Sequence, residues 1–140
     1  ADTHTCIDHA KPHGTSWQSH KCIVDGAAHA VFNGKIVVRP GAQRTDSSQS
    51  SRNLLLNAKA RVDTKPQLEI FADDVKCAHG ATVGQLDNEE VFYLKSRGLS
   101  ELTARNLLTY AFGAEIIDRI SVASLKHRLE QTVLEQTQRN

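Results

Sequence analysis

Residues 30–38 read AVFNGKIVV, two short apolar groups on either side of Asn33-Gly34. β-branched residues favour strands, and an Asn-Gly pair between apolar groups is a strong signal for a tight turn. The segment therefore predicts two short strands joined by a turn at Asn33-Gly34. Apolar groups of three to five residues recur at residues 54–56, 68–71 and 75–78. The turn residues that separate the groups include Pro40-Gly41, Asn57, Pro66 and Asp73-Asp74.

These short apolar groups indicate strands without intervening helices. No helical pattern of the length that a βαβ crossover needs lies between them, which excludes a parallel sheet of the α/β type. Two architectures remain: an antiparallel sandwich, or a parallel β-helix in which each coil buries its face on the next. Very short strands with bends between them suit the coil better, and we expect parallel coils over about residues 22–86. Periodicity alone leaves both architectures open.

Helical spacing replaces the strand pattern near Asp87. Asp87 and Ser100 are suitable N-cap residues for two helices, and Gly98 and Gly113 are expected to end them. A third helix is expected over about residues 114–136. Its apolar stripe consists of Val122, Leu125, Leu129 and Val133.

The change of pattern predicts two parts, a β core over residues 1–86 and a helical subdomain over residues 87–140. The chain has 140 residues, 39% of them hydrophobic and 24% charged, with a formal net charge of +1. This composition argues against a disordered chain, and the small net charge argues against a dedicated nucleic-acid binder. The apolar runs are too short to cross a bilayer. Because the chain lacks methionine and any signal-peptide pattern, we expect it to be a fragment of a longer protein.

Cys77 and His79 are the candidate metal ligands. Residues two apart on a strand point to the same face, so a thiol and an imidazole would lie side by side. Thiolates favour soft metals, but a closed zinc or iron–sulfur site needs about four ligands, so another chain would have to complete the site. Two alternatives remain on spacing alone: a buried cysteine beside a hydrogen-bonded histidine, or a stand-alone metal- or thiol-dependent enzyme that uses the Cys77–His79 pair.

A second group of cysteines and histidines lies near the N-terminus. Its members are His4, Cys6, His9, His13, His20 and Cys22. No CxxC or HxxxH pair in this group stands opposite a second such pair, so we expect ordinary surface or turn residues. Phosphate-binding, serine-hydrolase and HExxH zinc-protease motifs do not occur in the sequence. Three cysteines without a paired spacing favour a reducing compartment over a disulfide scaffold.

Several ordered segments together carry a family resemblance. They are residues 30–38, 42–46, 54–56, 66–84 (PQLEIFADDVKCAHGATVG) and 92–98. In these segments the chain resembles the C-terminal part of the SufD branch of the SufB/SufD family, which belongs to the SUF iron–sulfur cluster assembly system. The resemblance covers nearly the whole chain. It implies a right-handed parallel β-helix core followed by a small C-terminal α-helical subdomain, and a non-catalytic scaffold role.

The same resemblance implies partners and a site. It implies pairing with a SufB-like scaffold through the β-helix, and docking of a SufC-like ATPase on the C-terminal helices, where we expect contacts from Phe112 and Gly113. The Cys-x-His segment of the family matches Cys77 and His79, which would lend ligands to a shared site for a transient iron–sulfur cluster. We expect no stable cluster on the fragment alone. An uncapped end coil would also allow a homodimer. The expected location is the cytoplasm, or the plastid stroma for a plant protein.

Overall fold

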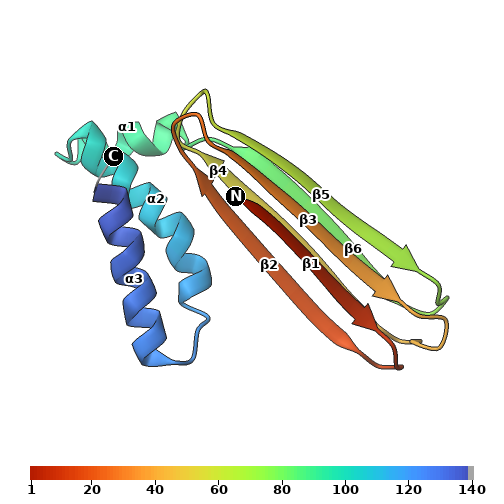
Figure 1. Ribbon diagram of the computed structural model, residues 1–140. Helices are drawn as coiled ribbons and strands as arrows, with labels where there is room; N and C mark the ends of the chain where they lie inside the picture. The colour runs from red at the N-terminus through yellow and green to blue at the C-terminus, as the bar shows by residue number, and fades with distance from the viewer. Residues whose placement is uncertain (139–140) are drawn as a thin grey trace. The chain divides into compact units, whose positions relative to one another are not determined.

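The computed structural model describes residues 1–138 and contains six strands followed by three helices (Figure 1). The strands are β1 (Asp2–His9), β2 (Thr15–Val24), β3 (His29–Val38), β4 (Asp46–Leu55), β5 (Arg61–Ile70) and β6 (Lys76–Gly84). The helices are α1 (Asn88–Ser96), α2 (Glu101–Ile117) and α3 (Ala123–Gln138). The chain divides into two compact units. The first unit, Ala1–Gly84, contains the strands, and the second unit begins at Gln85 and contains the helices. None of the described helices has the length and hydropathy needed to cross a bilayer.

Alternate strands belong to two parallel sheets. One sheet has the order β1-β3-β5 and the other β2-β4-β6. Each strand therefore pairs with the strand two places along the chain. In the first pairing of each sheet, Asp2 of β1 lies opposite Val31 of β3, and Thr15 of β2 lies opposite Asp46 of β4. Every pairing between the described strands is parallel, which excludes the antiparallel sandwich for this part of the chain.

The prediction of very short strands was wrong. The six strands have 8 to 10 residues, and they begin at Asp2 rather than near residue 22. Asn33-Gly34 is not a turn but lies in the middle of β3. A Cβ built at Gly34 would lie 2.4 Å from Gln49 Nε2, so this glycine provides space for a neighbouring side chain. Pro66 likewise lies inside β5, where a missing N–H is tolerated because β5 is an edge strand.

The interior of the strand unit contains two apolar clusters and a row of polar side chains. One cluster contains Ile36, Val38, Ala42 and Ala72, and the other contains Val24, Ala30 and Ala60. The two clusters lie at opposite ends of β3. Along β4, in the other sheet, four buried residues before Leu54 are instead polar: Ser47, Gln49, Ser51 and Asn53. This polar row explains why residues 46–53 escaped prediction as a strand, because they lack the apolar alternation of a half-buried strand.

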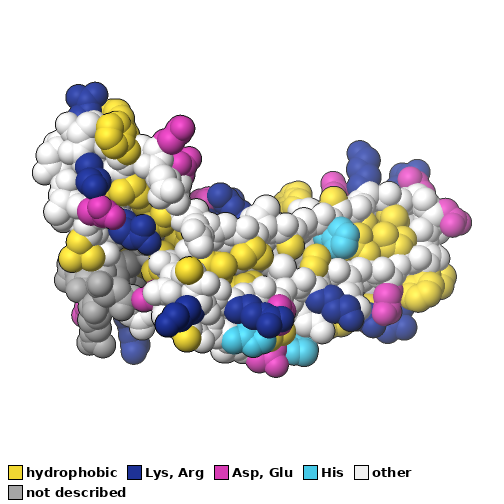
Figure 2. All heavy atoms as spheres, turned by 90° about the horizontal axis from the view of Figure 1, so that it is seen from above, with side chains coloured by type: hydrophobic (Ala, Val, Ile, Leu, Met, Phe, Trp, Pro, Cys, Tyr) yellow, Lys and Arg dark blue, Asp and Glu magenta, His cyan; other side chains and the backbone are white. Residues whose placement is uncertain are grey.

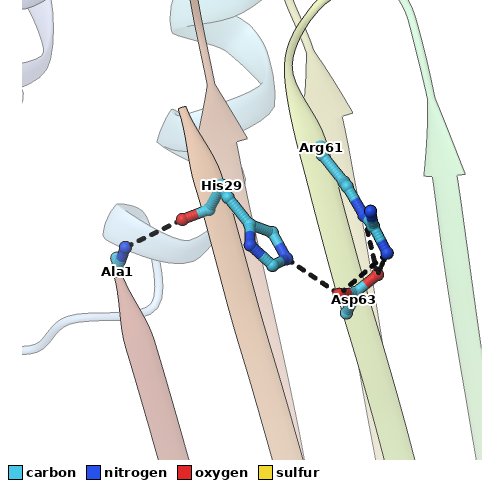
Figure 3. Close-up of polar contacts among 4 residues, drawn as sticks. All are labelled: Ala1, His29, Arg61 and Asp63. Carbon is cyan, nitrogen blue, oxygen red and sulfur yellow. Dashed lines mark hydrogen bonds and ion pairs between the residues drawn. The ribbon is translucent and has the colours of Figure 1, made fainter. Parts of the chain in front are cut away.

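Polar contacts link the outer faces of neighbouring strands. His29 Nε2 on β3 lies 2.8 Å from Asp63 Oδ2 on β5, and Arg61 contacts the same carboxylate (Figure 3). Arg39 donates two hydrogen bonds to Asp8, at 3.0 and 2.8 Å. Acidic and basic side chains are intermixed on the face shown in Figure 2. Since these pairs are exposed, they order the surface more than they stabilise the fold.

Local capping signals set three of the helix termini. Asp87 accepts a hydrogen bond from the Glu89 backbone amide at 2.8 Å, and Ser100 accepts one from Thr103 at 3.1 Å. Gly98 follows the end of α1 with φ of 95°, a conformation that favours glycine. These three predictions are confirmed.

The prediction that Gly113 ends the second helix was wrong. Helix α2 continues to Ile117, which is buried within its unit, and the third helix starts only at Ala123. A glycine inside a helix costs about 1 kcal/mol relative to alanine, which is comparable to what burial of one partly covered apolar side chain contributes. The packing of Ile117 is therefore sufficient to extend the helix past Gly113.

Candidate functional site

Cys77 and His79 lie on the same face of β6. In the register of β4 and β6, Cys77 is paired with Ser47 and His79 with Gln49. Ser47 and Gln49 are buried between the two sheets, at 1% and 2% exposure. Paired residues of neighbouring strands share a face, so Cys77 and His79 belong to the inner face of their sheet.

This inner face is incompletely covered at strands β5 and β6. We call these two strands the terminal edge. β5 and β6 are edge strands of their sheets, and among the described residues no further strand pairs with them. Cys77 is half-buried against the cluster of Ile36 and Val38, whereas His79 is exposed. Three large apolar side chains in or next to these strands are also exposed: Ile70, Phe71 and Val83.

The environment of Cys77 favours the neutral thiol. Burial raises the pKa of this thiol, the negative charge of Asp46 raises it further, and a hydrogen bond from the Ser47 backbone amide opposes both. A thiol in this environment is a weak nucleophile at neutral pH. A metal ion can still displace the proton, because the thiolate is the form that coordinates.

Two rows of polar side chains lead from the interior towards these residues. In the first row, His9 Nε2 lies 2.9 Å from Ser16 Oγ, which lies 2.7 Å from Ser47 Oγ, next to Cys77 in register. In the second row, Gln18 and Gln49 are hydrogen-bonded at 2.6 Å, and Gln49 is next to His79 in register.

The comparison with known proteins identifies the family. Residues 1–112 match the model of the SufBD core domain of the SUF system for FeS cluster assembly. The chain belongs to the SufBD family. The match includes both sheets, and it includes Cys77 and His79.

Three relatives of this SufBD chain come from two bacteria and a plant. An iron–sulfur cluster assembly SufBD family protein of Synechocystis is 56% identical over 95% of the chain. The iron–sulfur cluster assembly protein SufD of Escherichia coli is 48% identical over 91% of it. The chloroplastic protein ABCI7 of Arabidopsis thaliana is 44% identical over 84% of it. The chain spans only 29%, 30% and 25% of the lengths of these three relatives.

The N-terminal cysteines and histidines of the SufBD chain do not form one cluster. Cys6 is exposed on β1, Cys22 is half-buried on β2, and His13 lies between these strands with φ of 61°. His20 stacks on Phe32 with ring centroids 4.0 Å apart, and burial lowers its pKa. Within residues 1–138, no group of three or more His, Cys, Asp or Glu side chains could hold a metal ion.

The helical unit carries the expected ATPase-contact residues within α2. Phe112 and Gly113 are both partly buried there. The large apolar side chains that are exposed in the same unit include Phe92, Tyr93, Leu102, Leu107, Val122 and Leu125. The sequence pattern placed several of these on broad apolar helix faces that the small helical subdomain has little mass to cover.

Sequence reasoning missed the polar rows behind Cys77 and His79. A signal for them is present, since Ser16-x-Gln18 on one strand is followed by Ser47-x-Gln49 on the next strand of the same sheet. The paired residues are 31 apart, which is the spacing of one passage through both sheets.

Proposed function

We propose that this chain is part of a non-catalytic scaffold subunit that assembles iron–sulfur clusters. In this proposal, the strands form the last coils of a right-handed parallel β-helix. The alternation of the chain between two parallel sheets supports the coil, and connections between parallel strands of one sheet are almost always right-handed. The boundary between this core and the helical subdomain falls near residue 86.

One observation carries the function: Cys77 and His79 share one face of an edge strand. Thiolate and imidazole are suitable donors for iron in a cluster, but two ligands do not complete a site. A SufB-like partner at the terminal edge would supply the remaining ligands and cover Ile70, Phe71 and Val83. The cluster is the product that passes through this shared site, so the chain alone retains none. The raised pKa of Cys77 weighs against the alternative of a stand-alone thiol enzyme.

The helical unit would bind a SufC-like ATPase. Its exposed apolar side chains form the kind of surface that usually marks a protein interface. Phe112 and Gly113 are the contacts we assign from the family resemblance. Phe112→Ala should weaken capture of the ATPase while circular dichroism stays unchanged. Full capture by the variant would remove Phe112 from the interface, and loss of the folded signal would assign it to the core.

The decisive experiment uses the full-length protein that contains this chain, co-expressed with SufB-like and SufC-like subunits. Cys77→Ser and His79→Ala should each impair cluster formation, measured by iron and sulfide content and visible absorbance. Subunit assembly should be unchanged in gel filtration, where a homodimer of the full-length protein would also be detected. Cys6→Ser is the matched control, because Cys6 is exposed on the opposite edge strand β1. Normal clusters in both variants would make the Cys77–His79 pair structural.

The cellular location follows from the reducing conditions that such a site needs. We place the protein in the cytoplasm, or in the plastid stroma if the organism is a plant. The chloroplastic name of the Arabidopsis relative supports the second setting.

A further inference from the structure

Gln49 lies immediately behind His79 in the stack of strands. The two residues are register partners on β4 and β6, and both belong to the inner face of the sheet. Gln49 is 2% exposed, whereas His79 lies on the exposed terminal edge. Neighbouring strands are about 4.8 Å apart, so the two side chains are within reach of each other.

Contacts on two sides hold the Gln49 amide in one orientation. Its Nε2 donates a hydrogen bond of 2.6 Å to Gln18 Oε1. Gln18 Nε2 in turn donates one of 2.8 Å to Thr5 Oγ1 on β1. Across the interior, Gly34 leaves the space that the amide occupies, since a Cβ there would lie 2.4 Å from Nε2 and 2.8 Å from Cδ. The position of the other amide atom, Oε1, is therefore also determined.

Gln49 Oε1 is buried and has no hydrogen-bond partner among the described residues. Buried polar atoms are almost always paired, because an unpaired acceptor loses its hydration without compensation. An acceptor in this position normally receives a hydrogen bond from an ordered water, a ligand or a functional group that completes the site. The register partner that offers a donor here is the imidazole of His79.

We propose that Gln49 Oε1 accepts a hydrogen bond from a ring N–H of His79 when a partner covers the terminal edge, which makes Gln49 a positioning residue for His79. The inference rests on the proposed function, in which His79 is a metal ligand. A histidine that binds a metal through one ring nitrogen almost always donates the other N–H to an acceptor. That hydrogen bond fixes the tautomer and the ring orientation, and it leaves the lone pair of the other nitrogen for the metal.

The test measures metal affinity rather than cluster assembly. The full-length protein in complex with its SufB-like and SufC-like partners is titrated with Zn²⁺ alone, in competition with a chromophoric chelator. The affinity that disappears in His79→Ala defines the His79-dependent site. Gln49→Met keeps the length of the side chain but removes the acceptor, and it should lower this affinity about 10- to 100-fold. Gln49→Met should cause no further loss in the His79→Ala background.

Asn53→Leu is the matched control for removing a buried amide. Asn53 is on the same strand, is 3% exposed, and its Oδ1 also lacks a partner among the described residues. Its register partner is Val83, which offers no donor to a metal site, so this variant should keep the wild-type affinity. If Gln49→Met does not assemble, Gln18→Met provides the second variant, because it removes the acceptor that orients Gln49, and it should lower the affinity by a smaller factor.

The outcomes separate this inference from the proposed function. Wild-type affinity in Gln49→Met, or in Gln18→Met if that variant is needed, would overturn the role of Gln49 while His79→Ala still loses binding. An equal loss from Gln49→Met with and without His79 would show that Gln49 acts on the fold and not on the imidazole. Unchanged affinity in His79→Ala itself would contradict both the inference and the shared metal site.

Discussion

Gly34 on β3 faces the amide of Gln49 on β4 so closely that a Cβ at residue 34 would lie 2.4 Å from Gln49 Nε2. The two residues belong to different sheets, and the contact crosses the interior between them. This glycine is therefore required for packing, in a strand where its own backbone conformation is ordinary.

Gly34→Ala should destabilise the strand unit. The new methyl group must displace Gln49 or shift β3, and overpacking of this kind costs about 1–3 kcal/mol. The measurement is the free energy of unfolding in urea. Gly80→Ala is the matched control, because a Cβ at Gly80 meets nothing within 4 Å, and we expect no comparable loss. Equal stability of both variants would show that the interior accommodates the methyl group.

His20 should make stability depend on pH near neutrality. Burial lowers the pKa of His20, so the unfolded chain takes up a proton at higher pH than the folded chain does. Stability should therefore decrease as pH falls through the unfolded value of about 6.5. His20→Phe should reduce the difference in melting temperature between pH 7 and pH 5. His127→Ala is the control, since His127 is exposed on α3, and it should leave that difference unchanged.

Asp8 should stabilise the folded state at neutral pH and lose this effect in acid. Hydrogen bonds from Arg39 hold the pKa of Asp8 below its ordinary value. A lowered pKa in the folded state stabilises the fold above the unfolded value of about 3.9, and this contribution is lost as pH falls through the lower folded value. Asp8→Asn should flatten the acid limb of a melting-temperature profile. The effect should be small and should shrink at 1 M salt, because the pair is exposed; an effect that grows with salt would contradict this assignment.

Asp46 should slow the reaction of Cys77 with alkylating agents. Burial and the charge of Asp46 both raise the pKa of the Cys77 thiol, and the thiolate is the reactive form. In the full-length protein without partners, Asp46→Asn should shift the pH–rate profile of Cys77 alkylation to lower pH. Mass spectrometry of the peptide that contains Cys77 separates it from the exposed Cys6. If the profile does not move, the charge of Asp46 does not control the reactivity of Cys77.

The caps at Asp87, Ser100 and Gly98 could be predicted because they depend on residues within one helical turn. The shared face of Cys77 and His79 could be inferred in the same way, since strand geometry alone determines it. The change from strands to helices near Asp87 also follows from the spacing of apolar residues along the chain. For each of these features, the interacting groups are neighbours in the sequence.

Contacts between residues far apart in the sequence determined the features that local sequence patterns predicted wrongly or missed. Asn33-Gly34 has the composition of a turn, but it lies within β3, where the missing side chain of Gly34 leaves space for Gln49 of the other sheet. Gly113 has the composition of a helix end, but burial of Ile117 extends α2 past it. The hydrogen bond between Gln18 and Gln49 joins residues 31 apart, and the parallel register alone brings Gln49 next to His79. The energy of such contacts is gained only when the chain has returned to the same sheet, so no window of neighbouring residues contains it.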